Sequence, residues 1–247
     1  MLKGLNGIIG YEVAARDDKF GHVYDFYWED HFWTVRYVLV ETGSWLPGKL
    51  VLLSPVEAEE PDDASKLLTV RLTREKIENG PTAEQDRPVS RQREVALSRH
   101  YGWPAYWERG VGEEPFAPIA EPAEPKTGEL PSPRAVSDPH LRSLREVTGY
   151  HIFAKDGEIG HVEDVIADLT EWRIRYLVVD TRNWLPGRHV LVPPVWFNRI
   201  DWEERLVHAD LTQDEIRNSP AYDPSEPIDR AYEASLHEHY GRERYWE

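Results

Sequence analysis

The chain repeats itself at a constant offset of 139 positions, and this internal repeat constrains its fold more than any other feature. Trp45-Leu46-Pro47-Gly48 aligns with Trp184-Leu185-Pro186-Gly187 without a gap. The same offset holds at the end of the chain, where Tyr106-Trp107-Glu108 aligns with Tyr245-Trp246-Glu247. A gap-free repeat of this length predicts two copies of one structural unit.

The composition changes sharply between the two copies. Residues 109–140 are rich in proline and acidic side chains, which favour extended backbone and cannot bury enough apolar surface to form a core. We therefore expect a first domain over residues 1–108, a linker over 109–140 and a second domain over 141–247. The linker is interpreted as a spacer, with a strap packed across both domains as the alternative.

Each copy is expected to be mainly β. Residues 35–40 and 174–179 are almost continuously apolar and rich in branched side chains, which is typical of a central strand buried on both faces. Thr73 is a candidate N-cap for a short helix ending near Asn79, and a second helix is expected from Ser90 to Tyr101, before Gly102. The predicted fold is two tandem small β-barrels, each followed by short C-terminal helices.

The charge and the residue types limit the classes of partner. The formal net charge is −16, and acidic residues exceed basic ones in both copies, which argues against nucleic acid or anionic lipid as the main ligand. Cysteine is absent, which excludes disulfides and thiolate metal sites and favours a reducing compartment. No stretch is long and apolar enough to span a bilayer. We therefore expect a cytoplasmic protein, and we expect no cofactor.

The two copies resemble a known family. Phe20-Gly21-His22-Val23, the strand over 35–40, the segment from Leu52 to Pro55 and Leu72-Thr73 together are similar to the PRC-barrel domain. This small β-barrel is shared by the cytoplasmic part of the photosynthetic reaction centre H subunit and by a ribosome maturation factor. The resemblance implies a non-enzymatic adaptor whose barrel serves as a protein-binding or regulatory surface.

Six residues are candidates for partner binding. Tryptophan is enriched at binding hot spots, so the Trp-Leu-Pro-Gly turns and the aromatic tails are candidate anchors, although the turn tryptophans could instead plug the barrel mouths. Two aspartates in candidate strands could act on protons near a partner. These residues are Trp45, Trp184, Trp107, Trp246, Asp25 and Asp164.

Other polar groups are interpreted as structural. His22 and Asp25, like His161 and Asp164, are three positions apart on a strand and would face opposite sides unless a bulge intervenes. His237 and His239 point in different directions on a helix and lack a third ligand. The acidic residues over 57–63 lack the pattern of a calcium loop. We predict no catalytic residue and no metal site.

The sequence thus favours a non-enzymatic adaptor or regulatory protein that binds a protein partner through tandem PRC-barrels. A stress-related role is one option for this adaptor. The two copies are expected to form an intramolecular pseudo-dimer. Association of several chains into a homo-oligomer is left open as an alternative. One alternative is an accessory factor of a photosynthetic reaction centre or electron-transfer complex, in which Asp25 and Asp164 tune protons. A ribosome or RNA maturation factor is another, and it conflicts with the acidic charge.

Overall fold

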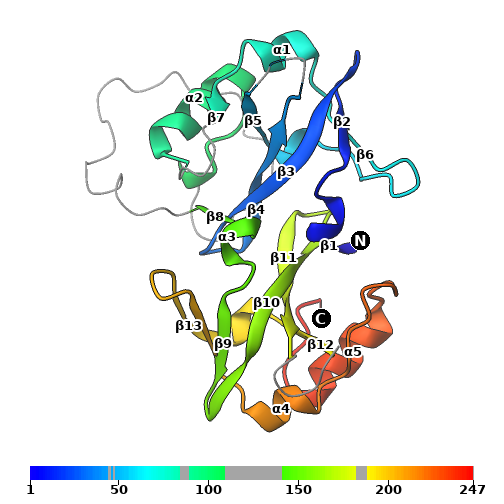
Figure 1. Cartoon of the computed structure of the whole chain (residues 1–247), viewed down its shortest axis with the longest axis vertical. Helices are drawn as coiled ribbons and strands as arrows, with labels where there is room; N and C mark the ends of the chain where they lie inside the picture. Colours follow the sequence, from blue (N-terminus) through cyan, green and yellow to red (C-terminus); the bar gives the residue numbers. More distant parts are fainter. Residues whose placement is uncertain (44–45, 47, 84–88, 109–140, 182–187, 247) are drawn as a thin grey trace. The chain divides into compact units, whose positions relative to one another are not determined.

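The computed structural model describes residues 1–43, 46, 48–83, 89–108, 141–181 and 188–246 (Figure 1). It divides into two compact units. The N-terminal unit comprises Ile8–Arg142, and the C-terminal unit comprises Met1–Gly7 together with Ser143–Glu247. Each unit is mainly β, as predicted, and carries short helices after its strands.

The N-terminal unit is built on long antiparallel strands. Its pairing order is β6-β2-β3-β4-β5-β7, in which only β6 and β2 are parallel, and β8 pairs with β3. The strands are β2 (Glu12–Ala14), β3 (Lys19–Glu29), β4 (Thr34–Glu41), β5 (Leu50–Leu53), β6 (Leu67–Thr69), β7 (Thr82–Ala83) and β8 (Leu141–Ser143). The helical elements are η2 (Pro55–Glu57), α1 (Arg74–Glu78), α2 (Arg91–Tyr101) and η3 (Tyr106–Glu108).

The C-terminal unit follows the same plan. Its pairing order is β13-β14-β9-β10-β11-β12, in which only β14 and β9 are parallel, and β1 pairs with β10. The strands are β1 (Leu2–Gly4), β9 (His151–Ala154), β10 (Gly157–Asp168), β11 (Arg173–Asp180), β12 (His189–Val192), β13 (Phe197–Asp201) and β14 (Leu206–Ala209). The helical elements are α3 (Leu144–Val147), η5 (Pro194–Trp196), α4 (Gln213–Arg217) and α5 (Arg230–His239); η1 (Asn6–Ile8) spans the boundary between the units.

The local signals for the helices are confirmed. The Thr73 side chain accepts from the backbone N–H of Lys76 at the start of α1, and Ser90 caps α2 in the same way. Gly102 ends α2 in the left-handed conformation, with φ of 79°. The central strand β4 is buried at every position except its last, because it lies between β3 and β5 and packs on both faces.

The predicted closure into two barrels is not confirmed. In the part of the chain that the structure describes, β7 pairs only with β5 and β6 pairs only with β2, so the sheet path stays open at both edges. The apolar side chains are nevertheless buried as the strand pattern requires, among them Phe26, Val40 and Leu52 in the N-terminal unit and Val165 and Tyr176 in the C-terminal unit.

The two units do not coincide with the two halves of the sequence, because the first strand of each half belongs to the unit formed mainly by the other half. β1 pairs antiparallel with β10 in the C-terminal unit, and Leu5 N–H donates to Val165 O at 2.9 Å. At the offset of 139, β1 corresponds to β8, which pairs with β3 in the N-terminal unit. There, Arg142 forms an ion pair with Asp30 at 3.1 Å. Each half of the sequence therefore supplies its first strand to the other unit.

Candidate functional site

The aromatic tail of the N-terminal unit is held by one buried carboxylate. Glu94 in α2 is fully buried, and it accepts hydrogen bonds from the hydroxyls of Tyr37 at 3.3 Å and Tyr106 at 2.6 Å. Arg91, one helical turn earlier, forms an ion pair with Glu94 at 2.9 Å. Its guanidinium also lies over the ring of Trp107, 4.5 Å from the centroid. This Tyr–Glu–Tyr cluster joins β4, α2 and the tail.

The C-terminal unit contains the same cluster at the offset of 139. Glu233 accepts from Tyr176 at 2.8 Å and from Tyr245 at 2.7 Å, and Arg230 donates to it at 2.8 Å. The guanidinium of Arg230 lies 4.7 Å from the centroid of Trp246. Both tails thus fold back onto their own unit through the same four contacts.

Burial keeps the tyrosines of these clusters protonated. Burial, followed by the charge of Glu233, raises the pKa of Tyr176 far above its ordinary range. Burial and the hydrogen bond to Glu233 raise the pKa of Tyr245 to about 12. Because a neutral phenol keeps its O–H donor, these tyrosines can donate their hydrogen bonds over the physiological pH range.

The structure places some of the predicted tryptophans and not others. Trp107 and Trp246 are half-buried under their arginines, and a small pocket beside the first tail is lined by Arg36, Trp103 and Trp107 among others. Trp45 and Trp184, in the Trp-Leu-Pro-Gly turns, lie outside the described residues. Whether they anchor a partner or plug a barrel stays a prediction.

The two predicted aspartates lie at equivalent bulges. The register shifts between Val23 and Asp25 in β3 and between Val162 and Asp164 in β10. Asp25 is buried and accepts from the N–H of Phe26 at 2.8 Å. The bulge that the sequence could not show is therefore present in both units.

Asp164 has the more unusual environment. Its Oδ1 accepts from the backbone N–H groups of Asn6 at 2.9 Å and Val165 at 2.7 Å. Burial raises its pKa to about 6, because the loss of water outweighs these two hydrogen bonds. Asp164 thus fastens the N-terminal segment to β10 and titrates near neutral pH.

Three of the four histidines that the sequence analysis interpreted as structural have a polar contact in the structure. His22 is exposed whereas Asp25 is buried. His161 Nε2 lies 3.8 Å from Asp180 Oδ2. His237 and His239 contact the backbone carbonyls of Glu243 and Glu215, both at 2.7 Å.

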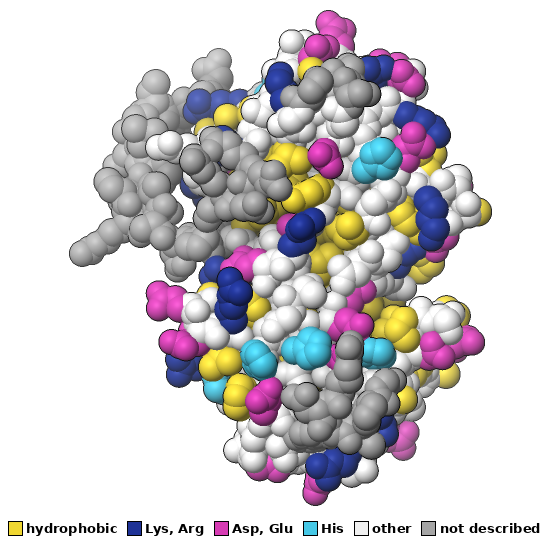
Figure 2. All heavy atoms as spheres, viewed as in Figure 1, with side chains coloured by type: hydrophobic (Ala, Val, Ile, Leu, Met, Phe, Trp, Pro, Cys, Tyr) yellow, Lys and Arg dark blue, Asp and Glu magenta, His cyan; other side chains and the backbone are white. Residues whose placement is uncertain are grey.

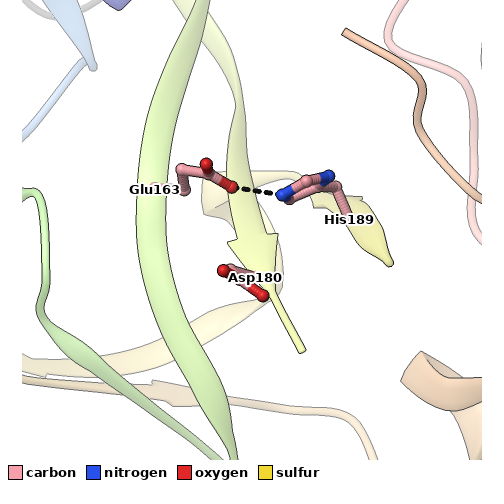
Figure 3. Close-up of side chains that lie close together, drawn as sticks. All are labelled: Glu163, Asp180 and His189. Atoms are coloured by element: carbon pink, nitrogen blue, oxygen red, sulfur yellow. Dashed lines mark ion pairs between the residues drawn. The ribbon is translucent and has the colours of Figure 1, made fainter. Parts of the chain in front are cut away.

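The sequence analysis missed a cluster of three other side chains. Glu163 in β10, Asp180 in β11 and His189 in β12 point toward one another (Figure 3). Their ligand-type atoms all lie within 4.8 Å, and they are the group among the described residues that could hold a metal ion. Glu163 Oε2 lies 2.5 Å from His189 Nε2. The cluster was missed because strand register brings it together and no sequence motif marks it.

The face of the molecule drawn in Figure 2 carries mixed charge. Figure 2 shows acidic and basic side chains interspersed over the viewed face, and among the described residues visible there the basic groups do not merge into one patch. Of the helices in the described ranges, none combines the length and apolar character needed to cross a membrane.

A family model and a curated relative both match part of the chain. Residues 139–216 match the family model described as the PRC-barrel domain. A protein of Deinococcus radiodurans, described only as uncharacterized, is 30% identical over 95 residues. This match covers 38% of the present chain and 32% of the relative, so the chain spans about a third of the relative's length. The resemblance drawn from the sequence is confirmed for the second copy, and the chain carries a PRC-barrel domain at residues 139–216.

Proposed function

We propose that the chain is a non-enzymatic adaptor in which two PRC-barrel copies bind a protein partner. The domain at residues 139–216 suggests a protein-interaction or maturation role. The proposal extends this domain to the first copy and assigns the binding role to the aromatic tails.

The observation that carries the extension is the agreement of strand register between the units. His22 pairs with Glu41 and Asp25 with Leu39 in the N-terminal unit. At the offset of 139, His161 pairs with Asp180 and Asp164 with Val178. The bulge also falls at the same place in both. Such agreement supports two copies of one domain, and the exchange of first strands supports an intramolecular pseudo-dimer.

The tails are the proposed contact surface. Trp107 and Trp246 present half-buried rings that are fixed by arginines and by the Tyr–Glu–Tyr clusters. A ring that is already ordered loses little conformational entropy when a partner covers it, which is why rigid aromatic side chains are effective anchors. Tyr245, with 38% of its surface exposed, extends the surface in the C-terminal unit.

The test is quantitative capture with matched baits. The intact chain, Trp107→Ala with Trp246→Ala, and the control His151→Ala are immobilised at equal density and exposed to an extract of the source cells. Proteins held by the intact chain are identified, purified and titrated against each bait. We expect one partner whose affinity falls at least tenfold in the double variant and is unchanged in the control. Melting curves verify that all baits are folded.

Two results would contradict the proposal. Equal binding by all three baits would exclude the tails as the contact surface. Turnover in a screen against hydrolase and metal-dependent substrates, lost on changing His22, would replace the adaptor with an enzyme. The identity of a partner also separates the alternatives, because photosynthetic subunits or ribosomal proteins would each select one of them.

A further inference from the structure

Three adjacent strands of the C-terminal unit align polar side chains in one row. His161 in β10 is paired with Asp180 in β11, and Asp180 is paired with His189 in β12. Directly paired residues in antiparallel strands point to the same face of the sheet. The row therefore has the carboxylate of Asp180 in the middle and one imidazole on each side of it.

Glu163 joins this row through the bulge in β10. The register passes from Val162 to Asp164, so Glu163 is the extra residue of the bulge, and such residues often re-aim a side chain. Its Oε2 lies 2.5 Å from His189 Nε2, yet this buried oxygen has no hydrogen-bond partner in the structure. The bulge therefore brings a carboxylate and an imidazole, both common metal ligands, to the same point of the sheet.

The donor set fits a first-row divalent transition metal. One imidazole nitrogen and two carboxylate oxygens lie within 4.8 Å of one another, so side-chain rotations that even out their spacing would allow bonds of about 2.0–2.2 Å to one shared ion. His161 Nε2 lies 3.8 Å from Asp180 Oδ2 and is not part of this group of three. Imidazole with carboxylate suits Zn²⁺, Mn²⁺ or Fe²⁺ better than Ca²⁺, which prefers oxygen alone.

The surroundings favour a cation that is reachable from solvent. The Asp180 side chain is fully buried, whereas those of His189 and Glu163 keep 19% and 40% of their surface exposed. Two of the three candidate ligands are carboxylates. The local charge is therefore negative, and a bound ion would keep contact with water.

The N-terminal unit provides an internal comparison. The equivalent row is His22, Glu41 and Leu50, and Tyr24 occupies the position of Glu163. Leucine cannot bind a metal, and this replacement removes the imidazole that contacts Glu163 in the other unit. The same strand arrangement thus exists with and without a complete donor set.

We infer that Glu163, Asp180 and His189 form a binding site for one divalent transition-metal ion, which the equivalent row of the N-terminal unit, with Leu50 in place of His189, lacks. This inference goes beyond the proposed adaptor function and does not depend on it. A metal here would tie β10, β11 and β12 together beside the bulge that positions Asp164.

The experiment titrates the full chain, stripped with a chelator, with Co²⁺ and with Zn²⁺. Visible d–d absorption reports the coordination of Co²⁺, and competition with a chromophoric chelator gives the affinity for Zn²⁺. The decisive variant is His189→Leu, since Leu50 shows that leucine is accommodated at this strand position. The control is His151→Ala. His151 Nδ1 lies 2.8 Å from Glu158 Oε1 in an exposed ion pair, which lies outside the three-residue cluster.

We expect one equivalent of metal per chain, an affinity at least tenfold lower in His189→Leu and in Glu163→Gln, and no change in His151→Ala. The melting temperature of the intact chain should rise with Zn²⁺, and that of His189→Leu should not, because only a ligand that binds the folded state stabilises it. The inference would be overturned if His189→Leu bound metal as tightly as the intact chain. It would also be overturned if the intact chain took no metal from the chromophoric chelator.

Discussion

Replacing Asp164 by asparagine should stabilise the protein at neutral pH. Asparagine keeps the Oδ1 that accepts from Asn6 and Val165, and it places an amide where Oδ2 now lies. That second position is closely covered by the backbone, since a Cβ added to Gly4 would lie 2.4 Å from Oδ2. The substitution therefore removes the charge while leaving shape and hydrogen bonds nearly unchanged.

The magnitude follows from the pKa of Asp164. Burial raises it from 3.8 to about 6, so the folded state holds the proton more tightly than the unfolded state. The stability contributed by this proton is complete below pH 3.8 and is lost as the pH rises through 6. At 1.36 kcal/mol for each pKa unit, ionisation in the folded protein costs about 3 kcal/mol at pH 7.5.

The assay is urea unfolding of the intact chain and of Asp164→Asn at several pH values from 4 to 7.5, followed by far-ultraviolet circular dichroism. The variant should match the intact chain near pH 4 and exceed it by up to about 3 kcal/mol at pH 7.5. Asp223→Asn is the control of opposite sign, because hydrogen bonds from Ser225 lower the pKa of Asp223 and its charge therefore stabilises the fold above that pKa. A difference between Asp164→Asn and the intact chain that stays constant with pH would refute the reasoning.

Three further substitutions test the packing. Glu94→Gln should destabilise the N-terminal unit by about 2 kcal/mol and expose Trp107 to fluorescence quenchers, because it breaks a buried ion pair with Arg91 and weakens two phenol hydrogen bonds. Gly160→Ala should cost about 3 kcal/mol in denaturant unfolding, since its Cβ would lie within 1.9 Å of the Asp180 carbonyl oxygen. Leu5→Ala should cost about 3 kcal/mol and speed amide exchange in β10, because Leu5 is fully buried; an unchanged exchange rate would contradict the pairing of β1 with β10.

The sequence predicts what local signals encode. The helix after Thr73 and the helix from Ser90 to Gly102 are confirmed, because capping residues act on backbone groups two or three positions away. The central strand over residues 35–40 is also confirmed, because a run of branched apolar residues is typical of a strand that is buried on both faces.

Features that depend on distant pairing could not be predicted. The bulge before Asp164 and the convergence of Glu163 with His189 follow from the register of β10, β11 and β12, which no local pattern specifies. The role of Glu94 was missed although the residue repeats as Glu233, because an isolated glutamate in a helix usually faces water. A difference between copies, such as Leu50 against His189, was the available signal for the metal-type cluster.

Because β1 pairs with β10 and β8 pairs with β3, a break in the chain between the two copies would not separate them. A protease that cuts between residues 109 and 140 produces two fragments, yet each fragment still contributes an edge strand to the sheet of the other. The nicked protein should migrate as one species on a native gel and separate only in denaturant. By the same topology, the two fragments made as separate polypeptides should recover the fold when mixed, whereas either alone would leave a vacant strand position open to aggregation.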